Sequence, residues 1–115
     1  MKKSTRKFFA VPVALAAASV VALTSSPASA AVITVNVGTS AIPQNAGCVF
    51  VTELTTDSIV QAKFTPGSTA RISGLNVQAG DRVHFDWRDV DCGPTTIRHD
   101  FHFAPKPLPT VWNIN

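Results

Sequence analysis

Short runs of strand-forming residues, each ended by glycine, proline or a polar turn, recur along most of the chain and restrict what it can fold into. A new run begins after about 8 to 14 residues, and no helix-length window has an apolar period near 3.6. Such a pattern in a small domain is typical of a β-sandwich or a small barrel. We expect strands at residues 32–37, 48–54, 58–64, 69–73, 75–77, 82–88 and 95–103.

The first 30 residues have the order of a secretory signal peptide. A basic segment with Lys2 and Arg6 precedes an apolar run from Phe8 to Leu23, and the small residues Ala28 and Ala30 follow. The apolar run has 16 residues, which is fewer than the roughly 20 that cross a bilayer as a helix. We therefore predict cleavage after Ala30, a secreted and extracellular mature protein, and no membrane insertion.

Cleavage changes the charge of the protein. The full chain has a formal charge of +3, but four of its ten Lys and Arg residues lie in the first 30 positions and all seven acidic residues lie after them. The 85-residue mature chain keeps six basic and seven acidic side chains, for a formal charge of −1. A charge this small gives no support to binding of nucleic acid or anionic membranes. We expect no nucleic-acid partner.

Two cysteines, Cys48 and Cys92, remain in the mature chain. A domain of this size gains only a few kcal/mol from its core, so a covalent cross-link would help it. Disulfides persist in an oxidising extracellular compartment, which argues against a reactive thiol or a metal ligand. We predict a disulfide between Cys48 and Cys92.

The expected organisation is a signal peptide at 1–30, a sandwich domain at 31–103 and a proline-rich tail at 104–115. Prolines 105, 107 and 109 favour extended backbone and remove three ladder donors, so the tail can follow a sheet edge but cannot form a central strand. A role of the tail in docking is the alternative to its lying on the surface. Trp112 in this tail is the candidate for an exposed aromatic binding residue.

Two segments, 82–88 and 95–103, are expected to pair as a hairpin across the loop at 89–94. Apolar residues alternate with polar ones in both segments, so each strand has one face that we predict to be buried. The predicted buried positions are Val83, Phe85 and Trp87 in the first strand, and Ile97, His99, Phe101 and Phe103 in the second.

Two pairings would bring these apolar faces together. Phe85 opposite Phe101 would place like charges opposite each other, which is destabilising. Trp87 opposite Ile97 instead places Asp86 against Arg98 and His84 against Asp100. We predict the second pairing, which leaves His99 on the buried face near Phe85. A core histidine satisfied by one hydrogen bond is then the simplest role for His99.

The stretch Leu75–Phe85, with sequence LNVQAGDRVHF, followed by Asp89 and His99, resembles the middle of the cupredoxins. This resemblance covers residues 75–103 and implies a cupredoxin-like sandwich with His99 as the first copper ligand. A blue-copper centre also needs a cysteine and a second histidine. Only 16 residues follow His99, they supply only His102, and Cys92 lies upstream. The expected fold is therefore a small single-domain β-sandwich, immunoglobulin-like or cupredoxin-like, with one disulfide and no blue-copper centre.

A second candidate metal site lies on the polar face of the same strands. In the predicted register His84 and His102 are diagonal neighbours, with Asp86 and Asp100 between them. Imidazole and carboxylate ligands suit zinc or copper(II). Charge pairs in solvent explain such a face equally well, so we expect no cofactor and keep copper or zinc as the alternative.

No catalytic residues are predicted. The sequence contains neither GxSxG nor HExxH, and 85 residues leave little room for a substrate cleft. Our leading hypothesis is a non-enzymatic, disulfide-linked binding protein for an extracellular partner, such as a protein, an enzyme that it inhibits or a wall polysaccharide. A cupredoxin-like metal-binding protein is the second hypothesis. The third is a surface protein whose sheet edges self-associate.

Overall fold

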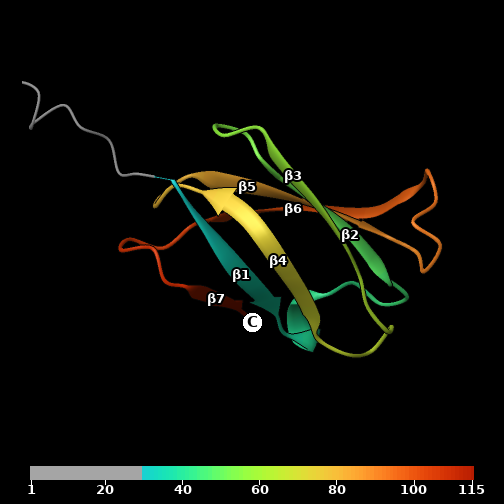
Figure 1. The fold of residues 1–115 in the computed structure, drawn as a ribbon. Helices are drawn as coiled ribbons and strands as arrows, with labels where there is room; N and C mark the ends of the chain where they lie inside the picture. Colours follow the sequence, from blue (N-terminus) through green and yellow to red (C-terminus); the bar gives the residue numbers. More distant parts are fainter. Residues whose placement is uncertain (1–29) are drawn as a thin grey trace, which may run out of the picture.

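The structure, a computed structural model, describes residues 30–115, and in this range it is built of β-strands (Figure 1). The predicted signal peptide, apart from its last residue, lies outside the described residues. The all-β fold expected from the sequence is confirmed. The elements are β1 (Ala31–Val37), the 3-10 helix η3 (Thr39–Ala41), β2 (Cys48–Glu53), β3 (Ser58–Lys63), β4 (Ala70–Val77), β5 (Arg82–Arg88), β6 (Thr96–Phe103) and β7 (Val111–Ile114).

The strands form two sheets that face each other as a sandwich. One sheet has the order β4-β1-β7 and the other has the order β3-β2-β5-β6. In Figure 1 the first sheet crosses in front of the second. All neighbouring strands are antiparallel except β1 and β7, which are parallel. This arrangement leaves β6 at one end of the four-stranded sheet.

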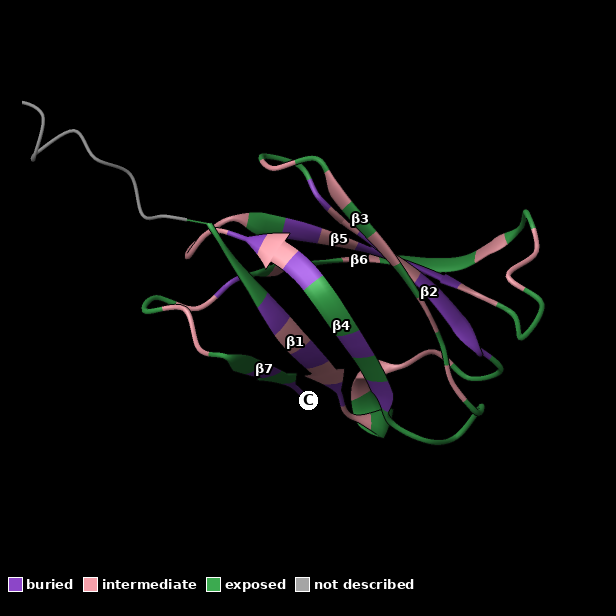
Figure 2. Cartoon of the chain, in the orientation of Figure 1, coloured by how far each residue is buried: buried purple, intermediate pink, exposed green. Residues whose placement is uncertain are grey.

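Side chains that alternate along the strands fill the space between the sheets. On β5, Val83, Phe85 and Trp87 are fully buried, as the period of two in the sequence predicts. Figure 2 shows the same alternation as buried and exposed bands along β4. Trp87 and Phe85 are the largest fully buried side chains, so β5 supplies the centre of the core.

The sequence suggested two short extended pieces on either side of Gly74, but the structure joins them into one strand. The register of β4 against β1 shifts between the pairs Val35–Ile72 and Ile33–Leu75, which leaves an extra residue on β4. Gly74 lies at this bulge with φ of 82°, a left-handed conformation that favours glycine. One flexible residue therefore lets a single strand continue across the sheet.

The C-terminal segment differs from the expected surface tail. Residues 111–114 form β7, which runs along the edge of the sheet beside β1. Trp112 is only 6% exposed and Ile114 is also buried, so the segment belongs to the core. The expectation of an exposed Trp112 is wrong, because the alternation in VWNI turns this ring toward Phe85.

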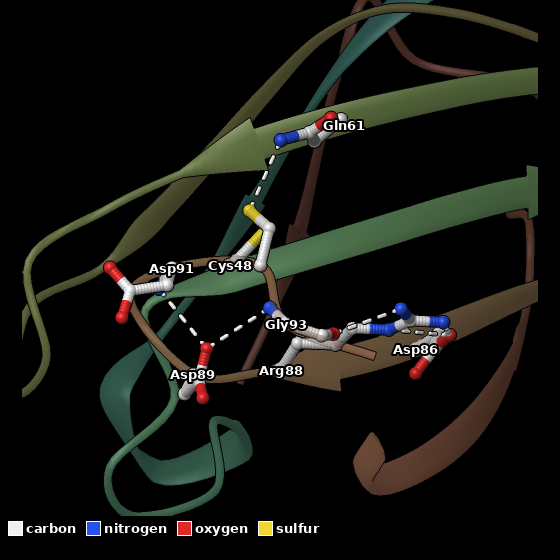
Figure 3. The surroundings of a disulfide bond; sticks show 8 residues. Cys48, Gln61, Asp86, Arg88, Asp89, Asp91 and Gly93 are labelled. Atoms are coloured by element: carbon white, nitrogen blue, oxygen red, sulfur yellow. Dashed lines mark hydrogen bonds and ion pairs between the residues drawn. A yellow bond between two sulfur atoms is a disulfide. The ribbon is translucent and has the colours of Figure 1, made fainter. Parts of the chain in front are cut away.

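The predicted disulfide is present. Cys48, at the start of β2, is bonded to Cys92, in the loop between β5 and β6, across a Cα–Cα distance of 5.3 Å (Figure 3). The side chain of Asp89 accepts hydrogen bonds from the backbone N–H groups of Asp91 and Gly93, each at 3.1 Å. The loop that carries Cys92 is therefore held by a covalent bond and by its own turn.

A disulfide is compatible with the extracellular location that the sequence predicts. Among residues 30–115 there is no helix with the length and apolar character needed to cross a membrane.

Candidate functional site

The pairing of β5 with β6 differs by one residue from both pairings considered in the sequence. Phe85 lies opposite Asp100, Trp87 opposite Arg98, and Asp86 opposite His99. The predicted pair Trp87–Ile97 is therefore wrong. Because the side-chain period of a strand is two, a shift of one residue turns every side chain of β6 to the other face of the sheet.

A buried hydrogen bond explains why polar side chains of β6 face inward. Trp87 is fully buried, and its indole Nε1 donates to Asp100 Oδ2 at 2.8 Å. A buried indole N–H left without an acceptor would cost about 1–3 kcal/mol. Arg98 pairs with Asp100 at 2.7 Å and donates to the backbone oxygen of Ala41 at 2.8 Å. The inward charges of β6 are therefore satisfied at the margin of the core.

The three histidines do not lie where the sequence placed them. His99 is exposed on the outer face of the sheet rather than buried beside Phe85, and it contacts His84. His102 lies on the inner face, where its ring meets the edge of Phe85 at 5.1 Å and that of Trp112 at 6.5 Å. His84 and His102 thus lie on opposite faces of the sheet, so the predicted polar-face metal site does not form.

The shift places aromatic and imidazole rings together on the outside of the sheet. Phe101 and Phe103 are 50% and 70% exposed. The ring of His84 lies between Phe101 and His99, with a centroid separation of 4.9 Å from each. We call His84, His99, Phe101 and Phe103 the outer β5–β6 face.

Cationic groups border these rings. The guanidinium carbon of Arg82 lies 4.6 Å from the centre of the Phe101 ring, and that of Arg88 lies 4.8 Å from the Phe50 ring on β2. Such cation–π contacts hold an aromatic ring in place while leaving part of it accessible. The outer face of β2, β5 and β6 is therefore aromatic and bordered by positive charge.

Asp86 is the anchor beneath this face. Its Oδ2 accepts hydrogen bonds from Arg88 Nε and Nη2 at 3.1 and 2.7 Å, and its Oδ1 accepts one from Thr96 Oγ1 at 2.7 Å (Figure 3 shows the Asp86–Arg88 pair). Burial alone would raise the pKa of Asp86, but the hydrogen bonds from Arg88 and Thr96 together with the charge of Arg88 leave that pKa below its usual value. Asp86 is thus an ionised, fully engaged carboxylate.

The closest contact on the outer face joins two imidazoles. His84 Nε2 and His99 Nδ1 are 2.7 Å apart, so one ring donates its N–H to the other. Burial, and then the positive charge of a protonated His99, lower the pKa of His84. Two neutral imidazoles at this distance can share a proton or a metal ion. Within residues 30–115, no group of three or more His, Cys, Asp and Glu residues is arranged to hold a metal ion.

The strand that carries these rings has a free edge. Backbone groups of an antiparallel strand point alternately toward and away from its partner. Ala104 N–H donates to Asp81 O at 2.8 Å, which fixes that alternation along β6. By this count Arg98, Asp100 and His102 bond to β5. The residues whose N–H and C=O groups point away from β5 are His99, Phe101 and Phe103.

Two surface hollows lie away from this face. One, of about 430 Å³, is lined by loop residues that include Pro43 and Pro66. The other, of about 420 Å³, is lined at the opposite sheet by residues that include Arg71 and Asn113. Neither has an Asp, Glu, His or Cys in its lining, so neither offers an acid–base pair.

Comparison with known proteins assigns no relative. No family model, no curated protein and no solved structure matches the chain. The candidate function therefore rests on the residues of this chain.

The sequence did not reveal the outer β5–β6 face, because Phe101 and Phe103 were expected inside. The signal that could have identified them is the need of a buried Trp87 for an acceptor. Asp100 is the nearest carboxylate able to meet it across the hairpin, and placing Asp100 inward turns Phe101 outward.

Proposed function

We propose that this chain is an exported, non-enzymatic binding protein that recognises another protein by adding a β-strand to the free edge of β6. The observation that carries the proposal is the coincidence, at His99, Phe101 and Phe103, of unpaired backbone groups with exposed side chains. Strand addition uses the backbone groups for affinity and the alternating side chains for selectivity.

The composition of β6 supports an edge that accepts a partner. Many proteins protect such edges with proline, with lysine or with a covering loop. Residues 96–103 contain neither proline nor lysine, and β6 is the last strand of its sheet within the described part of the chain. Phe103, which is 70% exposed, is the least covered of the large apolar side chains there. A partner strand would cover the edge and the rings in one step.

A protein partner fits this edge better than a polysaccharide. The unpaired groups recur at every second residue, which is the spacing of a strand's own donors and acceptors. A polysaccharide could stack on the rings but has no backbone amides to match this row.

The test separates backbone pairing from contact with the ring. The N–H of Phe101 points away from β5, so Phe101→Pro removes an edge donor without removing a hydrogen bond of the sheet. Phe101→Ala removes the same ring and keeps the N–H. Capture of proteins from the culture medium on the immobilised mature domain should be reduced by Phe101→Ala and abolished by Phe101→Pro. Equal capture by the wild type and Phe101→Pro would contradict strand addition.

The His84–His99 contact favours a second candidate, metal binding. A metal bonded to both nitrogens at about 2.0–2.1 Å, with the nitrogens 2.7 Å apart, would have an N–metal–N angle of about 80°. That angle is closer to the right angle of tetragonal copper(II) than to the tetrahedral angle of zinc. The pair lies on the outer face of one sheet, with no cysteine ligand beside it, and therefore differs from the copper site that the cupredoxin resemblance implies. We rank it second because two ligands make a weak site.

A further inference from the structure

We propose that the strand added to β6 is β6 of a second copy, paired antiparallel about a two-fold axis that passes beside Phe101. This inference rests on the proposed strand addition and names its partner. The dimer would join the two four-stranded sheets into one continuous sheet. A two-fold contact of this kind uses the same surface on both copies and closes on itself.

The charges of β6 select this register. With Phe101 opposite Phe101 of the second copy, Asp100 lies opposite His102 of that copy, so carboxylate faces imidazole twice. Sliding the strands by two residues toward the start of β6, so that Asp100 is central, would place two aspartates opposite each other, which is destabilising. The arrangement of acid and imidazole on either side of Phe101 is therefore self-complementary.

The same register uses every free backbone group of the edge. Phe101 pairs with itself, and His99 pairs with Phe103 of the second copy in both directions. These are three hydrogen-bonded pairs, with about six hydrogen bonds in all. A register centred on His99 would place Phe103 beyond the paired region and would use Ile97, where the β5–β6 ladder is irregular.

The outer face gains from the pairing as well. Phe101 would lie beside Phe101 of the second copy, and His99 beside the exposed ring of Phe103. Cross-strand aromatic pairs stabilise sheets, and here they would cover the most exposed rings of the chain.

Repulsion does not oppose this contact. Inward-pointing charges at an edge commonly prevent strand pairing. On β6 those charges are Arg98 and Asp100, which already form an ion pair at 2.7 Å within one copy. The mature chain has a formal charge of only −1, so two copies repel each other weakly.

Single-cysteine variants test the register directly. In an antiparallel hydrogen-bonded pair the Cα atoms are about 5.5 Å apart, which is within the range of a disulfide. Mature Phe101→Cys, oxidised at high concentration, should therefore form a covalent dimer. His99→Cys and Phe103→Cys should each remain monomeric alone, because each position is about 13 Å from its own copy. An equal mixture of the two should cross-link. Mass spectrometry checks that Cys48–Cys92 stays intact in each variant.

Sedimentation of the unmodified mature protein supplies the independent measurement. We expect a monomer–dimer equilibrium whose dissociation constant rises at least tenfold in Phe101→Pro. Cross-linking of His99→Cys with itself would overturn the register, and a wild type that stays monomeric at millimolar concentration would overturn self-pairing. If the wild type is monomeric but Phe101→Pro abolishes capture of a protein from the medium, strand addition stands and only the second copy is rejected. If both assays are insensitive to Phe101→Pro, the proposed function fails as well.

Discussion

The indole nitrogen of Trp87 and the carboxylate of Asp100 are joined by a 2.8 Å hydrogen bond that sets which face of β6 is turned inward. We expect Asp100→Ala to lower the free energy of unfolding by about 1–3 kcal/mol, because the buried indole N–H loses its acceptor. Asp100→Asn keeps an acceptor and loses only the ion pair with Arg98, so it should cost less. Urea denaturation followed by tryptophan fluorescence measures both. Equal losses in the two variants would show that the indole bond does not set the register.

A second prediction concerns the buried carboxyl of Glu53. This side chain is 0% exposed, its Oε1 accepts the N–H of Thr55 at 2.7 Å, and its Oε2 has no hydrogen-bond partner. Burial, together with the nearby carboxyl of Asp81, raises the pKa of Glu53 despite the opposing hydrogen bond from Thr55. The folded state therefore holds this proton more tightly than the unfolded state does.

The sign of the pH effect follows from that raised pKa. The contribution of Glu53 to stability is complete below the unfolded pKa of about 4.3 and is lost as pH rises through the higher folded pKa. Glu53→Gln keeps a neutral, hydrogen-bonding side chain, so it should be more stable than the wild type at pH 7 by about 1 kcal/mol. The two proteins should converge near pH 4. A wild type that gains stability relative to Glu53→Gln between pH 4 and 7 would contradict the raised pKa.

The disulfide supplies a third prediction. Closing a loop between residues 44 positions apart contributes up to about 4 kcal/mol in the chain-entropy description. Replacing both Cys48 and Cys92 by alanine should therefore lower the unfolding free energy by as much as this, a large fraction for so small a domain. Equilibrium denaturation gives the loss. Thiol labelling of the denatured wild type is the control and should modify neither cysteine.

Metal binding is tested by titration with copper(II) and zinc(II). If the imidazole pair is a site, copper should bind more tightly than zinc, and binding should be lost in both His84→Ala and His99→Ala. His102→Ala is the matched control, because that ring lies on the opposite face against Phe85. Calorimetry and the nitrogen coupling in the electron paramagnetic resonance spectrum provide the readouts. Binding that survives all three substitutions would reject the pair as the ligand.

The start of the mature protein is the fifth prediction. Cleavage after Ala30 would leave β1 complete, because that strand begins at Ala31. The intact mass of protein collected from the medium should correspond to residues 31–115. Secreted material that retains residues 1–30 would refute this site.

Local patterns in the sequence predicted most of the strands. The segment from Arg82 to Arg88 is a strand with the expected limits, and its alternation identified Phe85 and Trp87 as core residues. The pairing of Cys48 with Cys92 followed from the cysteine count and the expected compartment. These features depend on neighbouring residues or on a choice with one option.

Features that depend on distant contacts were not predicted. In β6 polar and apolar residues alternate, so either face can be buried, and the choice depends on Trp87 in another strand. The meeting of His84 with His99 follows from that choice. The inclusion of Trp112 in the core depends on β7 reaching β1, at the other end of the domain. Alternation within a segment carries no information about such partners.

The parallel pairing of β1 with β7 makes completion of the domain depend on its last residues. Val35 lies opposite Trp112 and Val37 opposite Ile114, so the first strand of the domain gains its second neighbour only when the final strand is present. A copy that stopped before Val111 would leave β1 as a bare edge and remove two buried side chains from the core. Such a copy would be open to proteases, whereas a full-length chain would close, so the C-terminal strand acts as a built-in proofreading step for chain length.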